Sequence, residues 1–163
     1  MNGNRSVADL RFIIDHNAGK LAGWLRMLGF DSLFFTGEDD SDMVRQALAE
    51  GRIILTRDTG VMKRRVITQG RLKAILIKSE EPEEQIRQLM AELDIKGQSH
   101  PFTLCLECNR PLVAINPADV KDRVPPYVFK TQTQYVECPT CRRIYWRGTH
   151  WAAMLHKLEK LVG

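Results

Sequence analysis

Two short apolar runs in the first sixty residues each lead into an aspartate. Phe12–Ile14 is followed by Asp15, and Ile53–Arg57, which is apolar over its first three residues, is followed by Asp58. Such runs are typical of strands that helices cover on both faces of a parallel sheet. Ligands of these sheets bind beyond the carboxyl ends of the strands. The runs therefore predict an α/β domain with two carboxylates at its binding edge.

The apolar runs belong to a repeated pattern. They lie at 10–14, 32–35, 53–56 and 74–77. Segments with helical periodicity lie at 17–28, 41–50 and 80–94. Gly29, Gly51 and Gly70 end three of the connections, where a left-handed glycine usually stops a helix. A βαβαβαβα order with right-handed crossovers predicts a three-layer α/β/α domain around a parallel sheet.

The repeated pattern stops near residue 95. We expect two domains, residues 8–98 and 99–163, the second with a β-like run at Thr133–Glu137, a turn at Pro125-Pro126 and a C-terminal amphipathic helix. The net charge is +4, and the second segment holds the excess because acids and bases balance in the first. No apolar stretch approaches the roughly 20 residues of a membrane span, and residues 1–9 lack a signal-peptide apolar region. We expect a soluble, cytoplasmic protein without a membrane partner.

All four cysteines stand in two Cys-x-x-Cys pairs, Cys105 with Cys108 and Cys138 with Cys141. This spacing lets both thiolates of a pair reach one tetrahedral zinc ion, and two pairs complete a closed, structural shell. Two disulfides or a redox-active dithiol are the alternatives. Disulfides are disfavoured in a chain without signs of secretion, and a redox pair would not need a second pair. We expect one structural Zn²⁺ in a zinc ribbon whose folding depends on the metal.

Acidic residues gather at the predicted binding edge of the sheet. Asp15 follows the first apolar run, Asp58 follows the third, and the segment 38–42 after the second run includes Asp40 and Asp42. Carboxylate oxygens are preferred ligands of Mg²⁺ and Mn²⁺. Such ions can activate water and clamp a phosphoryl oxygen. The pattern predicts metal-assisted hydrolysis of a phosphodiester.

The same acids have structural alternatives. Asp15 and Asp58 could each cap a helix that follows. Asp40 or Ser41 could cap the helix over 41–50, and Asp42 would then be a first-turn acid favoured by the helix dipole. The convergence of three acidic groups on one edge favours the metal site over capping alone.

Two further residues near these runs are set aside. Asp31 precedes the second run, so we expect it at the opposite edge of the sheet. His16 follows Asp15 and could be a metal ligand, but a lone histidine is more often incidental.

Basic and aromatic residues are predicted to hold a polyanion. Near the acids these are Lys20, Arg57, Lys63, Arg64 and Arg65. In the second domain they are Arg142, Arg143, Tyr145, Trp146 and Arg147. Single-stranded bases stack on such aromatic rings while arginines follow the phosphates. The alternatives are a solvated helix face for the 63–65 run and, for Tyr145 and Trp146, packing of the ribbon against the other domain.

Several of these motifs, in order, are similar to a known family. The segment Asp15–Asp31, with its Gly-Lys-Leu-Ala-x-Trp-Leu-Arg-x-Leu-Gly-Phe-Asp run, resembles the opening of the Mut-seven C-terminal RNase domain family, which has a PIN-like nuclease fold. Gly51–Asp58 resembles its third-strand signature. Both cysteine pairs, Val124–Pro126 and the Arg-Arg-Ile-Tyr-Trp-Arg run after the last cysteine also fit. The resemblance covers residues 10 to about 155.

The resemblance implies a PIN-like α/β nuclease domain fused to a zinc ribbon. It also implies a metal-dependent endoribonuclease that uses Mg²⁺ or Mn²⁺, with Asp15, Asp42 and Asp58 as catalytic metal ligands and RNA as the partner. PIN domains often have a fourth acid shortly after the Thr-x-Asp element, but residues 59–65 contain none. The alternative function is therefore a non-catalytic module that binds RNA or ribosomes. A phosphatase ranks last, because Asp15-His16-Asn17 lacks the paired Asp-x-Asp arrangement.

Overall fold

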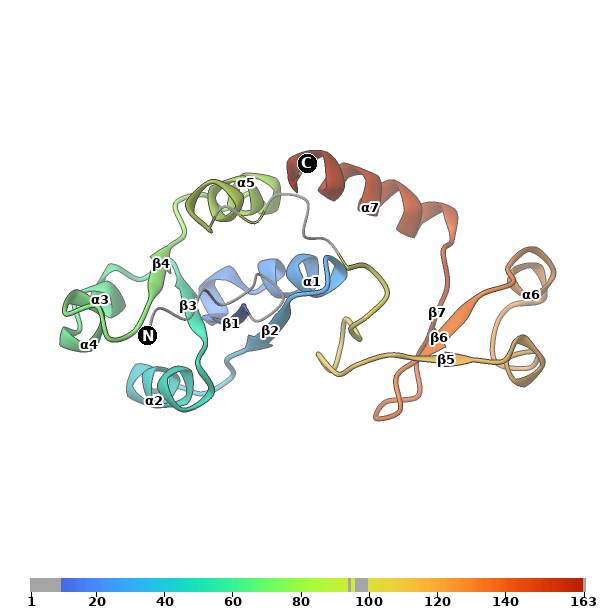
Figure 1. Ribbon diagram of the computed structural model, residues 1–163, viewed down its shortest axis with the longest axis horizontal. Coiled ribbons are helices and arrows are strands. Elements are labelled where there is room, and N and C mark those ends of the chain that lie inside the picture. Colours follow the sequence, from blue (N-terminus) through green and yellow to red (C-terminus); the bar gives the residue numbers. More distant parts are fainter. Residues whose placement is uncertain (1–9, 94, 96–99, 163) are drawn as a thin grey trace, which may run out of the picture.

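A four-stranded parallel sheet is the core of the amino-terminal part of the computed structural model, which describes residues 10–93, 95 and 100–162 (Figure 1). Its strands are β1 (Arg11–Ile14), β2 (Asp31–Phe34), β3 (Ile53–Thr56) and β4 (Ala74–Leu76), in the order β2-β1-β3-β4. Ile14, near the carboxyl end of β1, lies in register with Phe34 and Leu55. The predicted parallel sheet and its four apolar runs are confirmed.

Helices join these strands as the periodicity predicts, with one exception. The short helix η2 (His16–Ala18) leads into α1 (Lys20–Met27), and α2 (Asp40–Glu50) and α5 (Pro82–Leu93) follow β2 and β4. The connection between β3 and β4 instead holds two one-turn helices, α3 (Thr59–Met62) and α4 (Arg65–Thr68). They are separate because Arg64 is extended (φ −64°, ψ 140°). Within the described part of the chain, no helix is long and apolar enough to cross a membrane.

Alternate residues of each strand point to opposite faces of the sheet, and helices cover both faces. Phe12 and Leu55 pack with Leu21 of α1 and Leu89 of α5 in one core cluster. Ile13 and Ile54 pack with α2 residues such as Met43 in another. The result is the predicted three-layer α/β/α arrangement. Gly29, Gly51 and Gly70 all have the left-handed backbone (φ 93°, 65° and 77°) expected at helix ends.

The last helix, α7 (Thr149–Val162), packs against α5 (Figure 1). Leu158 is fully buried in the same cluster as the α1 and α5 residues, and Lys157 pairs with Glu83 of α5. A helix expected in the second domain therefore also completes the core of the sheet. The proposed boundary between 98 and 99 lies outside the described residues.

Residues 100–148, here called the cysteine module, contain a small antiparallel sheet. Its strands are β5 (Val113–Ile115), β6 (Tyr135–Glu137) and β7 (Ile144–Tyr145), with η3 (Pro117–Asp119) and α6 (Pro126–Thr131) between β5 and β6. The run at 133–137 becomes β6, as predicted. The expected turn at Pro125-Pro126 instead starts α6, because a proline fits the first helical position.

Candidate active site and cysteine metal centre

Asp15 and Asp58 meet at the carboxyl edge of the sheet through one threonine. Asp15 follows β1 and is 2% exposed, and Thr56, the last residue of β3, is fully buried. Thr56 Oγ1 donates to Asp15 Oδ2 at 2.8 Å and accepts from the Asp58 backbone N–H at 3.0 Å. The hydroxyl holds the two loops in a fixed relation, so these acids come together as the sequence predicts.

Both aspartates also cap helices, so the capping alternative is confirmed alongside their convergence. Asp15 Oδ1 accepts from the His16 N–H at 2.9 Å at the start of η2. Asp58 Oδ1 accepts from the Gly60 N–H at 2.8 Å at the start of α3. The caps orient each carboxylate. The second oxygen of Asp58 makes no hydrogen bond to the described part of the chain.

The acid electrostatically coupled to this pair is Asp40, the first residue of α2. Partial burial is the main reason why the pKa of Asp40 is raised, and the negative charges of Asp15 and Asp58 add to it. Arg64 opposes the shift, and its Nη1 donates to Ser41 Oγ at 3.1 Å. Asp15, Asp40 and Asp58 thus bring negative charge and carboxylate oxygens to this edge of the sheet, which suits a hard divalent cation.

The predicted third acid, Asp42, pairs with a residue of its own helix. Its side chain is 58% exposed and forms an ion pair with Arg45 at 3.0 Å. The predicted cap at Asp40 is wrong: Asp39 caps α2, accepting from the Ser41 N–H at 2.8 Å. In the described residues, no three carboxylates place their ligand atoms all within 4.8 Å of one another.

Two pockets open at this edge, with His16 bordering both. The basic pocket, of about 430 Å³, is lined by His16, Asn17, Lys20, Arg57, Glu80 and Gln85. The acidic pocket, of about 470 Å³, is lined by His16, Phe34, Phe35, Glu38 and Asp40. His16 Nδ1 lies 2.9 Å from Asp15 Oδ1. Sequence reasoning set His16 aside, although its position directly after Asp15 was the signal for this placement.

The basic residues predicted near the acids lie in three different places. Lys20 and Arg57 line the basic pocket, and Arg64 faces α2 beside Asp40. Lys63 and Arg65 are exposed. The structure thus brings three of the five cations next to the acids and leaves two on the surface beyond them.

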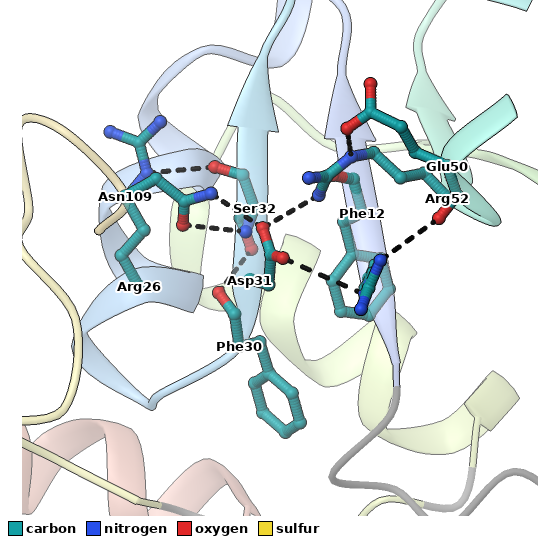
Figure 2. A network of polar contacts seen from close by, with 9 residues as sticks. Phe12, Arg26, Phe30, Asp31, Ser32, Glu50, Arg52 and Asn109 are labelled. Carbon is teal, nitrogen blue, oxygen red and sulfur yellow. Dashed lines mark hydrogen bonds and ion pairs between the residues drawn. The ribbon is translucent and has the colours of Figure 1, made fainter. Parts of the chain in front are cut away.

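The opposite edge of the sheet carries a polar network that joins it to the cysteine module (Figure 2). Asp31, the first residue of β2, accepts from Arg52 Nη1 at 2.8 Å and from Asn109 Nδ2 at 2.6 Å. Asn109 Oδ1 accepts from the Ser32 N–H at 2.9 Å. Arg52, 8% exposed, also donates to the Phe12 carbonyl at 3.1 Å. Asp31 therefore lies away from the acidic site, as predicted, and has a docking role.

A second arginine extends this contact. Arg26 of α1 donates through Nε to the Ser32 carbonyl at 2.9 Å and through Nη1 to the Leu106 carbonyl at 2.7 Å. The Glu107 carbonyl lies 3.4 Å from the same nitrogen. Both carbonyls belong to the loop between Cys105 and Cys108, so the first cysteine loop is seated directly on α1 and β2.

Replacing Asp31 with alanine should lower the free energy of unfolding by about 2 kcal/mol, because it removes the acceptor of the Arg52 and Asn109 hydrogen bonds and leaves the buried Arg52 guanidinium paired with Glu50 but not with Asp31. Hydrogen bonds from Arg52 and Asn109 outweigh burial, which alone would raise the pKa of Asp31, and hold it below its usual value. The stabilisation is therefore present above the ordinary aspartate pKa and is lost as pH falls below it. Urea denaturation at pH 7 and at pH 3.5 measures this.

The control is Asp122→Ala, since Asp122 is exposed. If Asp31→Ala lowered the free energy of unfolding by no more than the roughly 0.5 kcal/mol typical of surface substitutions, the result would contradict the docking role.

The four cysteines converge in the cysteine module. Their sulfur atoms all lie within 4.8 Å of one another, and Cys105 Sγ is 3.6 Å from Cys141 Sγ. Cys105 and Cys138 are fully buried. This cluster has the donor chemistry and size to hold a metal ion such as zinc.

The two cysteine loops have the same backbone geometry. Asn109 and Arg142, each directly after the second cysteine of its pair, are left-handed (φ 57° and 68°). Their N–H groups donate to the Cys105 and Cys138 carbonyls at 2.9 and 2.8 Å. Each first cysteine N–H in turn donates to a carbonyl across its loop, at 2.8 and 2.9 Å. Two loops of matching shape, facing each other, present four sulfurs to one point.

Tyr145 contacts this cluster directly. Its hydroxyl accepts from the Leu106 N–H at 3.2 Å and lies 3.2 Å from Cys105 Sγ. Burial opposes ionisation of Cys105, but hydrogen bonds from Tyr145 and from the backbone outweigh it and lower the pKa of this thiol to about 7. A thiolate is the form that binds metal. Tyr145, one of the aromatic residues predicted to stack on RNA, thus also supports the cysteine cluster.

Of the other predicted residues of the module, Arg142, Arg143 and Arg147 are exposed and Trp146 is half-buried. Trp146 packs on Tyr135 (ring centroids 6.5 Å apart), and the Arg147 guanidinium lies 5.1 Å from the centre of the Phe102 ring. Arg142 pairs with Glu137 at 3.6 Å, and Arg143 is exposed. Trp146 therefore packs on a residue of its own module, whereas the alternative expected it to pack against the other domain.

Comparison with known proteins agrees with the resemblance seen in the sequence. The model of the family described as Mut7-C RNAse domain matches residues 10–158. No curated protein and no solved structure matches the chain. The matched span includes both the acidic edge and the four cysteines, and the family indicates a nuclease-like role with RNA as substrate. Because the match covers nearly the whole chain, this protein belongs to the Mut7-C RNAse domain family.

Proposed function

We propose that the protein is a metal-dependent endoribonuclease that hydrolyses RNA phosphodiester bonds at the carboxyl edge of its four-stranded sheet. The observation that carries this proposal is the linkage of Asp15 and Asp58 through Thr56, with Asp40 in their electrostatic field. Cleavage of labelled RNA that needs Mg²⁺ or Mn²⁺ and stops in EDTA tests it.

Asp15, Asp58 and an acid at the start of α2 would hold the metal. A bound Mg²⁺ or Mn²⁺ supplies an activated water and charge stabilisation at the phosphoryl group. Thr56 and the His16 N–H keep Asp15 from rotating, so little reorganisation is needed when substrate binds. Lys20, Arg57 and Arg64 would neutralise phosphates next to the acids, and Lys63 and Arg65 would follow the strand outward.

Comparing variants of Asp40 and Asp42 identifies which acid of α2 binds the metal. Asp42 is the acid that the resemblance indicates, whereas Asp40 is the one whose pKa responds to Asp15 and Asp58. We expect Asp40→Asn to reduce kcat/KM by about 100-fold, because a metal ligand contributes several kcal/mol at about 1.4 kcal/mol per tenfold. Asp42→Asn, which removes only an exposed ion pair with Arg45, should change it by less than about threefold.

Both variants are measured under identical metal concentrations, with melting temperature as the check on folding. A large loss in Asp42→Asn with little change in Asp40→Asn would reverse the assignment and make Asp42 the metal ligand.

We further propose that the four cysteines hold one structural Zn²⁺ and that the module helps to bind RNA through Arg142, Arg143, Tyr145, Trp146 and Arg147. Zinc thiolates fit a reducing, cytoplasmic setting. The module contacts α1 and the amino end of β2, while the acids lie at the opposite edge. Four residues at about 3.3 Å each separate the edges by about 13 Å. RNA that touches both must therefore extend along the sheet.

The alternative function is a non-catalytic module that binds RNA or ribosomes. It is favoured by the absence of an acid in residues 59–65, where PIN domains often have one. RNA binding without cleavage at any Mg²⁺ or Mn²⁺ concentration would favour this module over the nuclease.

A further inference from the structure

The basic pocket adjoins the acids but is separate from them. The Arg57 N–H donates to Asn17 Oδ1 at 3.1 Å, and Asn17 Nδ2 lies 3.4 Å from Asp15 Oδ2. Asn17 and Arg57 thus form a wall shared with the acidic site. The remaining wall comes from Lys20 at the start of α1 and from Gln85 of α5.

Gln85 is the unusual member of this pocket. It is 3% exposed, and its Nε2 donates to the Ser79 carbonyl at 2.8 Å, which fixes the orientation of the amide. Its carbonyl oxygen, Oε1, is buried and has no hydrogen-bond partner among residues 10–93, 95 and 100–162. Buried acceptors are nearly always satisfied, so an orphan acceptor beside a cavity indicates that a ligand supplies the donor.

The charges of the pocket indicate that this ligand also carries an anion. Lys20 and Arg57 contribute two cations, and no side chain caps α1 and no acid stands in its first turn. Helix N-termini of this kind favour phosphate. Arg57 Nε is buried without a partner in the described part of the chain, while its Nη1 lies 3.3 Å from Glu80 Oε1.

We propose that the basic pocket binds one ribonucleotide unit of the RNA chain next to the bond that is cleaved. Its phosphate lies against Lys20 and Arg57, and its 2′-hydroxyl donates to Gln85 Oε1. This assignment rests on the proposed ribonuclease function and deepens it. The 2′-hydroxyl is the group by which a protein distinguishes RNA from DNA at a given site. DNA would leave Gln85 Oε1 unpaired, so the pocket selects RNA.

Glu80 lines this pocket and competes with a ligand for Arg57. The orphan atoms of Gln85 and Arg57 are covered, so a ligand reaches them only when a side chain at the rim moves. The Glu80 side chain is 79% exposed and holds Arg57 by an exposed ion pair, which is weak. A phosphate can therefore displace the Glu80 carboxylate from Arg57.

The first test scans an RNA oligonucleotide with single 2′-deoxy substitutions on both sides of the mapped cleavage site. Affinity is measured in EDTA by fluorescence anisotropy, and kcat/KM in Mn²⁺. One position should weaken binding to the wild-type chain about 3- to 10-fold, the effect of one hydrogen bond. In Gln85→Met the same deoxy substitution should have no further effect, because the acceptor is absent.

A wild-type chain that binds RNA and DNA versions equally at every position overturns the 2′-hydroxyl assignment, and this result needs no variant to fold. A deoxy effect of the same size in Gln85→Met would also overturn the assignment. The binding assay is independent of catalysis. Failure to cleave any RNA would count against the proposed nuclease, while a position-specific deoxy effect in EDTA would still support the pocket.

The second test removes the competing carboxylate. Glu80→Gln should raise affinity for RNA about two- to fivefold at low salt, since Arg57 is released to the phosphate. Its matched control is Glu84→Gln, because Glu84 pairs with Arg87 on the exposed face of α5, outside the pocket. Unchanged or weaker binding of Glu80→Gln, or an equal gain in both variants, would overturn the phosphate assignment.

Discussion

Replacing Asp15 with asparagine is expected to reduce RNA cleavage about 1000-fold without unfolding the protein. The change is isosteric, so the amide oxygen can still accept the His16 N–H and the amide nitrogen can still pair with Thr56 Oγ1. What is lost is the negative charge of a carboxylate that is 2% exposed. Removing one such charge from a metal site costs roughly 4 kcal/mol of transition-state stabilisation. Single-turnover cleavage in Mn²⁺ measures it.

The matched control is Asp39→Asn. Asp39 also caps a helix at this edge, accepting from the Ser41 N–H, but it is exposed. The same chemical change there should leave cleavage within about threefold of wild type. If Asp15→Asn retained wild-type activity while folded, Asp15 would not be a metal ligand. If Asp39→Asn lost as much activity, the effect would arise from helix capping and not from the site.

The fold was predictable because its signals are local. Each strand is a short apolar run covered on both faces, and Gly29, Gly51 and Gly70 mark helix ends where the backbone must be left-handed. The matched spacing of the two cysteine pairs is equally local, and their sulfurs meet as expected. The connection after Asp58 was less predictable, since Arg64 breaks it into two turns so that Val61 and Val66 can both pack on the sheet.

The sequence predicted that the site lies at the carboxyl edge of the sheet, but it did not identify all of the residues that form the site. Asp40 and Asp42 are two residues apart on one helix turn, and periodicity alone does not decide which of them faces Asp15. The role of Asp31 depends on Asn109, 78 residues away, and the orphan oxygen of Gln85 depends on how α5 packs. Such long-range pairings arise from tertiary structure and leave no local pattern in the sequence.

The cysteine module should be the part of the molecule most dependent on metal. Its own core is small, consisting of Val120, Val124 and Tyr135 with a few partly buried neighbours, and β7 has only two residues. A core of this size offsets little of the entropy of ordering the chain. In small zinc domains, metal binding contributes about 10 kcal/mol or more. The module should therefore fold only when the four thiolates are bridged.

We accordingly expect about one zinc ion per chain and expect Cys138→Ser to lose it, with loss of amide hydrogen-exchange protection across β5–β7. Because Arg26 and Asn109 hold the first cysteine loop on the sheet, β2 should also lose protection at its amino end while β3 stays protected. Thr140→Ser, inside the second loop but exposed, is the matched control and should keep the metal. A metal-free chain with a protected β6 would show that the cysteines are not a structural zinc site, because the strands would then be stable without any bridge between the sulfurs.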